Sequence, residues 1–225
     1  GRATCPYPSR FAAPEGGFCG CPPSRYCRVM TDLSTKPAIR RACLARRDLI
    51  EPGEAHAAAK VIAREGLSLI RRLVPVCGTI GAYWPIRSEI STRPLLETLA
   101  KAGYRVALPA TVAAAKPLRF HLWSPGDDLH VGPLGLAEPS GDAPVATPDA
   151  LFVPLAAFDG SGHRIGYGGG NFDATLDGLR KGRPLPAIGL AFALQEVAAV
   201  PAEPHDQKLD YVITEEKTFS FGANG

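Results

Sequence analysis

The chain has 225 residues, of which 45% are hydrophobic and 21% are charged, so one sizeable apolar core can form without a metal or a disulfide. Its 25 basic and 22 acidic residues give a net charge of +3, too small and too dispersed for a protein that binds nucleic acid along a basic stripe. The most apolar run, residues 187–194, is far shorter than the roughly 20 residues of a membrane span. We therefore expect one globular domain and exclude nucleic acid and membrane as partners.

Residues 1–29 differ in composition from the rest of the chain. They lack the continuous apolar core of about 7–15 residues that a signal peptide requires. Their cysteines lack the paired spacing that makes a zinc site a strong prediction, although a zinc site stays open as the less favoured alternative. These cysteines are Cys5, Cys19, Cys21 and Cys27. We expect a disordered or artefactual leader before a start at Met30, and a single domain at residues 30–225. Cys43 and Cys77 are then expected to be buried thiols in a reducing cytoplasm.

Apolar periodicity predicts helices and strands that alternate along the chain. We expect helices at residues 36–50, 54–73, 93–102 and 171–180, and strands at residues 79–83, 104–108, 118–123, 150–154, 187–192 and 209–214. Pro109 should end the second strand, and residues 124–148, rich in Gly, Pro and Asp, should wrap the surface. This alternation is typical of an α/β fold with a mostly parallel sheet covered on both faces. Such folds bind ligands at the carboxyl ends of their strands.

The segment at residues 151–173 runs from a buried strand through Arg164 into a glycine cluster and the start of a helix. The cluster consists of Gly166, Gly168, Gly169 and Gly170. Glycines let backbone N–H groups approach an anion, and a helix start adds unsatisfied donors. Arg164 adds a full charge with forked donors. The spacing matches neither the P-loop nor the dinucleotide-binding motif. The residues alone therefore support either a phosphate site or a glycine-rich turn that connects two elements.

The same segment resembles the signature of the 5-formyltetrahydrofolate cyclo-ligases, also called 5,10-methenyltetrahydrofolate synthetases. In that family Arg-x-Gly-x-Gly-x-Gly precedes an aromatic pair and an Asp. Three further motifs resemble the family in the same order: Lys-x-x-x-Arg at residues 36–40, Tyr-x-Pro-x-x-x-Glu-x-x-Thr at residues 83–92, and His-Asp-x-x-Leu-Asp at residues 205–210. The resemblance implies a three-layer αβα sandwich similar to ribose-5-phosphate isomerase and the CoA transferases.

By this resemblance the protein is an enzyme that uses ATP and Mg²⁺ to convert 5-formyltetrahydrofolate into 5,10-methenyltetrahydrofolate. ATP would phosphorylate the formyl oxygen, and N10 of the same folate would then attack the activated carbon and release phosphate. Because the nucleophile belongs to the substrate, the protein has to position the reactants and neutralise charge. We also expect a cytoplasmic monomer that acts on small molecules.

The resemblance assigns roles to individual residues. ATP would contact Lys36, Arg40, Arg164, Gly166, Tyr167, Gly168, Gly169, Gly170, Asn171 and Phe172. The reduced folate would contact Glu89, Tyr167, Gly168, Gly169, Gly170 and Asn171. The metal ligands would be Asp173 and Asp206. Arg164 would be the catalytic residue, because it would stabilise the charge that develops on the transferred phosphoryl group.

Several of these residues have a structural alternative. Lys36 and Arg40, four positions apart, could form a solvated helix face. Asp173 could stabilise a helix dipole, and Glu89 could cap the helix that follows it. Asp206 could be a surface carboxylate in a polar loop, where His205 is expected to be exposed.

Asn171 and Phe172 depart from the family pattern, which has Tyr or Phe followed by Tyr. Asn171 cannot stack on a folate ring as an aromatic side chain does, and Phe172 has no hydroxyl group. A non-catalytic relative that binds a nucleotide or a reduced folate is therefore the second hypothesis. A sugar-phosphate isomerase on the same general fold is the third and the weakest, because no motif supplies its general base.

Overall fold

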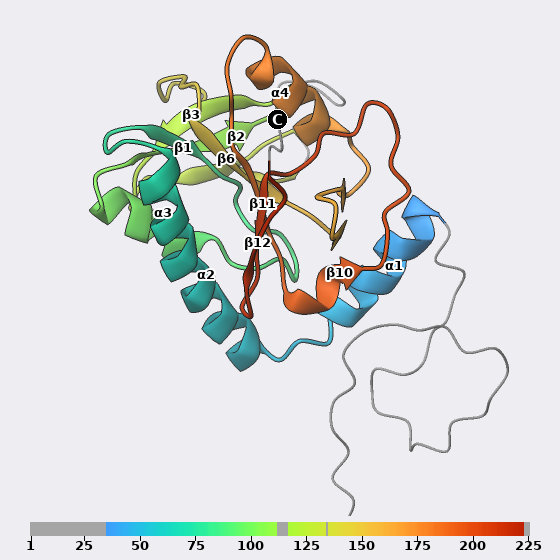
Figure 1. The fold of residues 1–225 in the computed structure, drawn as a ribbon. Coiled ribbons are helices and arrows are strands. Elements are labelled where there is room, and N and C mark those ends of the chain that lie inside the picture. The colour runs from blue at the N-terminus through green and yellow to red at the C-terminus, as the bar shows by residue number, and fades with distance from the viewer. Residues whose placement is uncertain (1–34, 112–116, 134, 223–225) are drawn as a thin grey trace, which may run out of the picture.

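Continuous apolar segments form the centre of a seven-stranded sheet in the computed structural model, which describes residues 35–111, 117–133 and 135–222. The predictions for residues 1–29 lie outside these ranges. The strands follow the order β12-β11-β9-β6-β1-β2-β3 (Figure 1). Their bounds are β1 Thr79–Gly81, β2 Arg105–Ala110, β3 Arg119–Trp123, β6 Ala150–Pro154, β9 Ala187–Leu190, β11 Tyr211–Ile213 and β12 Thr218–Ser220. Strands β11, β9, β6, β1 and β2 run parallel, and the two edge strands pair antiparallel.

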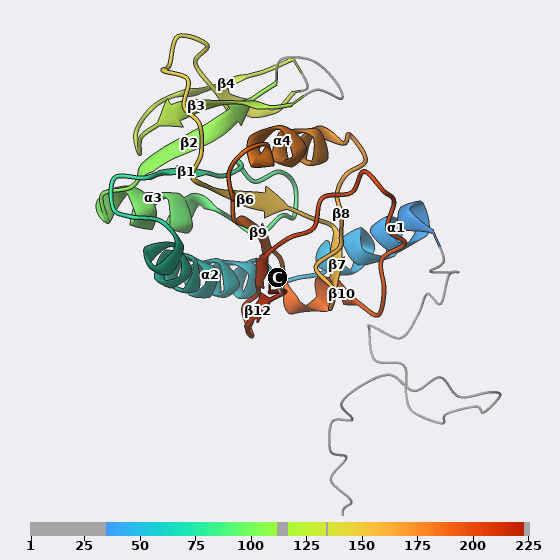
Figure 2. The ribbon, with the colours of Figure 1, turned by 45° about the horizontal axis from the view of Figure 1, so that its top comes forward.

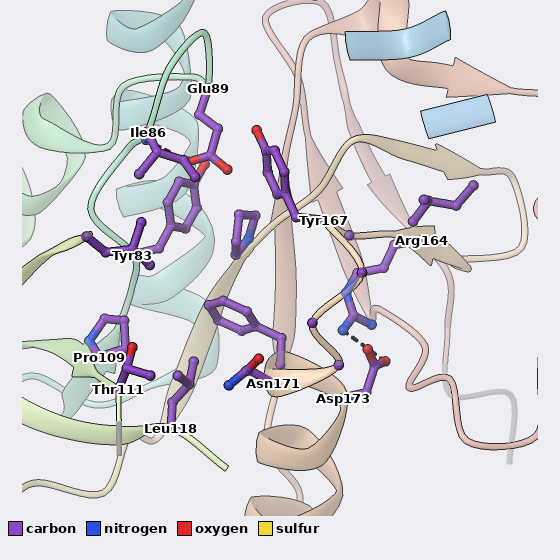
Figure 3. A pocket seen from close by; sticks show the side chains of 18 of the residues that line it. Tyr83, Ile86, Glu89, Pro109, Thr111, Leu118, Arg164, Tyr167, Asn171 and Asp173 are labelled. Carbon is purple, nitrogen blue, oxygen red and sulfur yellow. Dashed lines mark hydrogen bonds and ion pairs between the residues drawn. The ribbon is translucent and has the colours of Figure 1, made fainter. Parts of the chain in front are cut away.

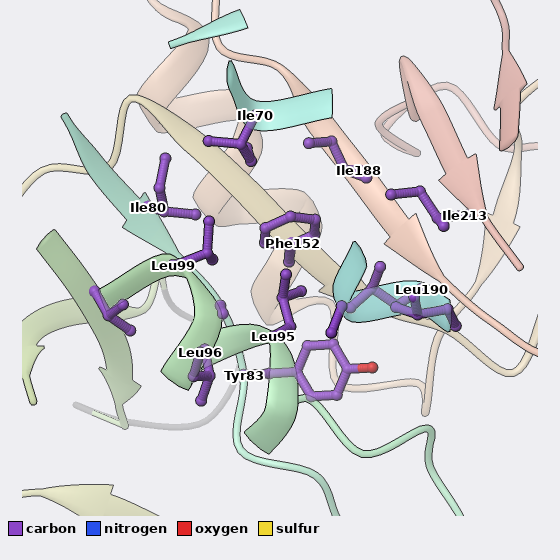
Figure 4. Packing of buried hydrophobic residues seen from close by; sticks show 14 of the residues in the cluster. Ile70, Ile80, Tyr83, Leu95, Leu96, Leu99, Phe152, Ile188, Leu190 and Ile213 are labelled. Atoms are coloured by element: carbon purple, nitrogen blue, oxygen red, sulfur yellow. The ribbon is translucent and has the colours of Figure 1, made fainter. Parts of the chain in front are cut away.

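Helices cover both faces of this sheet (Figures 1 and 2). They are α2 Pro52–Leu73 and α3 Arg93–Lys101 on one face and α4 Asn171–Arg180 on the other, whereas α1, Lys36–Arg47, packs outside this sheet against residues 157–159 and 193–195. Because strand side chains alternate, Phe152 packs with Leu95 and Ile70 under α3 and α2 (Figure 4), whereas Leu151 packs with Leu176 of α4 on the other face. The predicted three-layer arrangement with a mostly parallel sheet is confirmed.

Two smaller sheets accompany the central one. A three-stranded sheet has the order β10-β7-β8, with β7 at Ala157–Asp159, β8 at Arg164–Ile165 and β10 at Glu196–Val197 after the short 3₁₀ helix η1, Ala193–Gln195. The antiparallel strands β4, Leu129–Val131, and β5, Ala137–Pro139, form the other. Sequence reasoning missed these strands and β12, because elements of two or three residues carry no measurable apolar periodicity.

Three expectations need correction. Strand β2 continues through Pro109. Its parallel pairing with β1 ends at Ala107, so the backbone N–H that Pro109 lacks is not needed for a hydrogen bond to β1. Residues 124–148 do not merely wrap the surface, because they contain β4 and β5 and part of them lines a pocket. Cys43 is a buried free thiol as expected, but Cys77 is exposed.

The order of the parallel strands places a switch point between β1 and β6. From β1 the chain moves outward to β2, and from β6 it moves in the opposite direction to β9 and β11. Loops that leave adjacent strands in opposite directions open a crevice at their carboxyl ends, where such folds bind ligands. No helix among the described residues combines the length and the apolarity needed to cross a bilayer.

Candidate active site

A pocket of about 400 Å³ lies at the carboxyl ends of β1, β2 and β6. Its walls include Tyr83 and Trp84 just after β1, Thr111 just after β2, and Pro154 at the end of β6. The glycine segment that leads into α4 forms the facing wall (Figure 3). The pocket therefore occupies the predicted position at the switch point of the sheet.

Every residue predicted for the site lines this one pocket. The set is Lys36, Arg40, Glu89, Arg164, Gly166, Tyr167, Gly168, Gly169, Gly170, Asn171, Phe172, Asp173 and Asp206. These residues come from four segments that are far apart in the sequence. Their juxtaposition excludes a glycine-rich turn that only connects two elements, whereas their individual roles stay predictions.

Helix α1 points two cations into the pocket. Thr35 caps its first turn by accepting the N–H of Ala38, and Ile39 packs against the three-stranded sheet. Arg40 Nε donates to the carbonyl oxygen of Gly166 at 2.6 Å. Lys36 and Arg40 thus line the pocket, and the alternative of a solvated helix face is wrong for this pair.

The glycine segment adopts a backbone that other residues rarely adopt. Gly168 has φ +102°, and Gly170, the N-cap residue of α4, has φ +65°. A Cβ atom at Gly168 would lie 3.6 Å from the Arg40 guanidinium. No side chain caps α4, so its first-turn N–H groups remain suited to an anion from the pocket.

Arg164 is held rigidly at the same end of the pocket. Its side chain is 3% exposed, one guanidinium nitrogen lies 3.0 Å from Asp173 Oδ1, and another donates to the Gln207 carbonyl at 2.5 Å (Figure 3). Burial lowers the pKa of Arg164, and the Asp173 carboxylate opposes that shift. Asp173 lies in the first turn of α4, as expected, and also accepts the N–H of Gln207 at 3.0 Å.

Carboxylates gather around Lys36. Its Nζ lies 2.7 Å from Asp206 Oδ2 and 2.6 Å from Glu203 Oε2. Burial raises the pKa of Asp206, but the Lys36 hydrogen bond and the Glu203 N–H outweigh it, so the pKa is lowered overall. Glu203, His205 and Asp206 offer ligand atoms within 4.8 Å of one another. His205 is exposed as expected, yet it lines the pocket.

The other end of the pocket is largely apolar and contains Glu89. Thr92 donates to the Tyr83 carbonyl at 2.8 Å, which fixes the segment between them. Glu89 Oε2 accepts the N–H of Ile86 at 2.9 Å, so Glu89 caps a local turn and not helix α3. Burial raises the pKa of Glu89 to about 7, against lowering contributions from that N–H and from Arg47. The Tyr167 hydroxyl points toward Glu89 (Figure 3).

Comparison with known proteins agrees with this geometry. The model of the 5-formyltetrahydrofolate cyclo-ligase family matches residues 32–215. The chain belongs to this family. It is therefore an enzyme of the ligase class in folate metabolism, which excludes the sugar-phosphate isomerase.

Curated cyclo-ligases are similar over most of their length. The chain is 34% identical to 5-formyltetrahydrofolate cyclo-ligase of Escherichia coli K12 over 66% of this chain and 84% of that protein. It is 32% identical to the enzyme of Mycolicibacterium smegmatis over 80% of this chain and 93% of that one. The structure of 5,10-methenyltetrahydrofolate synthetase from Aquifex aeolicus matches with a TM-score of 0.65 at 25% identity, and covers 84% of this chain and 94% of that one.

Among the residues that sequence reasoning missed are Glu203 and Glu138, which line this pocket, and Arg47, which contacts the pocket residue Tyr167. Arg47, 2% exposed, donates to the Tyr167 hydroxyl and lies on the same face of α1 as Lys36 and Arg40. The spacing of positions 36, 40 and 47 places the three side chains on one face of a helix, and this spacing could have revealed Arg47. Glu203 lies three residues before Asp206 in a polar loop, and nothing in its spacing distinguishes it. Glu138 lies in the stretch that was expected only to wrap the surface.

Proposed function

We propose that the chain catalyses the ATP-dependent cyclisation of 5-formyltetrahydrofolate to 5,10-methenyltetrahydrofolate, with release of ADP and phosphate. One observation carries this proposal: a single pocket has a cationic, glycine-lined end and an apolar end with a carboxyl group. The first suits a triphosphate, and the second suits a flat ring with N–H donors. We further propose a monomer, since the residues of one chain complete the pocket. We also propose that it is cytoplasmic, since the buried free thiol of Cys43 suits a reducing compartment.

The cationic end would bind the β- and γ-phosphates of ATP. Backbone N–H groups from Gly168 to Gly170 would surround the oxygens, and Arg40 would keep the segment in place through the Gly166 carbonyl. Arg164 would lie against the transferred group, where a buried and immobile guanidinium stabilises developing charge most effectively. Lys36 would exchange its carboxylate partners for phosphate oxygens.

Asp173 and Asp206 would hold Mg²⁺, and Glu203 adds a third carboxylate to that end of the pocket. Hard divalent cations prefer oxygen ligands. Glu203 and Asp206, together with His205, offer ligand atoms within 4.8 Å of one another, whereas Asp173 lines the same pocket outside this group. Lys36 pairs with Asp206, and Arg164 pairs with Asp173. Bound Mg²⁺ would neutralise charge on the phosphate oxygens.

The apolar end would bind the pterin ring of the folate. Ionised Glu89 would accept hydrogen bonds from ring N–H groups, and Tyr83, Trp84 and Phe172 would supply apolar surface. Asn171 supplies no aromatic face at its position, so we expect weaker folate binding than a tyrosine there would give.

The chemistry balances without a protein nucleophile. The formyl oxygen attacks the γ-phosphorus, and ADP leaves with the bridging oxygen. N10 then attacks the formyl carbon, and phosphate leaves with the former formyl oxygen as N10 loses its proton. The protein would contribute alignment of the two substrates and charge stabilisation, the main requirements of phosphoryl transfer.

The proposal is tested by mixing the protein with 5-formyltetrahydrofolate, Mg²⁺ and ATP and measuring the ultraviolet absorbance of the methenyl product. We expect a rise that requires ATP. Thermal stabilisation by both ligands without any ATP-dependent rise would identify the non-catalytic binder instead.

A further inference from the structure

Glu138 is a buried acidic residue to which no role has yet been given. It lies on β5, opposite His130 of β4, and β5 packs against β2 and β3. Glu138 is 4% exposed, and its Oε1 atom is buried without a hydrogen-bond partner among the described residues. Nevertheless it lines the pocket. A buried polar atom of this kind is uncommon in a folded protein, and it is costly unless a ligand completes its bonding.

The backbone provides space for this carboxyl group. A Cβ atom at Gly132 would lie less than 3.0 Å from all three atoms of the Glu138 carboxyl group. Only glycine at position 132 therefore leaves the carboxyl group in its observed place. Glycine at position 132 is needed for this close packing and not for an unusual backbone conformation, because its φ is not positive.

The position of Glu138 selects the kind of ligand. Strand β5 lies beside β2, which contributes Pro109 to the pocket, and Leu136 precedes β5 on the same wall. The cations that suit phosphate belong to α1 and to the segment before α4. A carboxyl group in an apolar wall repels phosphate and favours a flat ring that carries N–H donors.

We propose that Glu138 accepts a hydrogen bond from an N–H group of the reduced folate's ring system and is a specificity-determining residue. This inference rests on the proposed function and deepens it. Glu89 and Glu138 would then recognise the ring from two walls of the pocket, since Glu89 belongs to the loop after β1 and Glu138 to β5. Two acceptors at fixed positions discriminate against ring systems that lack one of the donors.

The test compares Glu138→Leu, Glu138→Gln and the wild-type chain, with Glu216→Leu as control. Glu216 is exposed and does not line the pocket. For Glu138→Leu we expect the KM for 5-formyltetrahydrofolate to rise tenfold or more, the KM for ATP to change less than twofold, and the Tm of the free protein to stay equal or increase. Glu138→Gln keeps the side-chain volume and one acceptor oxygen, so its KM for 5-formyltetrahydrofolate should lie between those of the wild type and Glu138→Leu.

The Tm increase caused by 5-formyltetrahydrofolate alone gives a readout that does not depend on turnover. We expect a smaller increase for Glu138→Leu than for the wild type. If the wild type shows no turnover but the folate-induced Tm increase is still smaller for Glu138→Leu, the proposed reaction is contradicted and the assignment of Glu138 stands. A lowered Tm of both Glu138 variants with unchanged folate KM would show a structural role and overturn the inference, as would a raised KM for ATP alone.

Discussion

Arg164 combines burial, charge and a fixed orientation at the cationic end of the pocket. We predict that Arg164→Ala lowers kcat about 10²-fold, because removal of one donor that stabilises a transition state costs about that much. Arg183→Ala is the matched control, since Arg183 pairs with Asp149 and does not line the pocket. Steady-state kinetics checks both variants. A kcat for Arg164→Ala equal to that of the control would remove Arg164 from the mechanism.

We predict that Glu89 makes folate binding depend on pH near neutrality. Its pKa is raised to about 7 by burial, so its ionised fraction grows as the pH increases from 6 to 8. Only the ionised group accepts hydrogen bonds at both oxygens, and we therefore predict that the KM for folate falls over this range. Glu89→Gln should raise the KM and flatten this dependence. A wild-type KM independent of pH would contradict the assignment.

The raised pKa of Glu89 also makes the free energy of unfolding depend on pH. The folded state keeps the Glu89 proton up to a pH of about 7, whereas the unfolded state loses it near the usual value of 4.5. Between these values the folded state binds more protons, so this carboxyl group lowers the free energy of unfolding as the pH rises. Relative to Glu89→Gln, the wild type should lose stability across that interval and change little above it, as measured by urea unfolding.

Individual site residues were predictable where a motif fixed their spacing. The positions of Lys36, Arg164 and Asp173 in one pocket could be predicted in this way, although their ion pairs could not. Glu138 and Arg47 could not be predicted, because what distinguishes them is burial beside groups distant in the sequence. No local pattern reports such burial.

The glycine segment acts as one element with α1, whose Arg40 holds the Gly166 carbonyl. We predict that Gly168→Ala raises the KM for ATP about tenfold, since φ +102° costs an L-residue about 1–2 kcal/mol and the loop must shift. Gly178→Ala within α4 is the control, because its Cβ would have open space and alanine favours a helix. Equal ATP kinetics in both variants would contradict a role for this backbone shape.

Elements differed in how far the sequence determined them. Helix α4 begins and ends where the glycine cluster and the apolar spacing predicted. Strand β2 passes through Pro109 because its partner ends first, and this depends on the neighbouring strand and not on its own residues. Strands β4 and β5 are held by pairing and by packing against β2 and β3, so their own short sequences could not reveal them.

At the scale of the molecule, the alternation of helices and strands was sufficient to predict the layers and the edge of the sheet that carries the pocket. The family model begins at residue 32, so residues 1–29 lie outside the matched part. We predict that a chain starting at Met30 has the same kcat and the same Tm as the full chain. A large loss of either in the shortened chain would instead support a metal site on the cysteines of residues 1–29.

The central claim is that one pocket transfers the γ-phosphoryl group of ATP to the formyl oxygen of the folate. Single turnover with 5-formyltetrahydrofolate carrying ¹⁸O in its formyl group tests this most directly, with mass analysis of the inorganic phosphate. We expect one labelled oxygen in the phosphate for each methenyl product formed. Unlabelled phosphate, with the label released to water, would contradict the account.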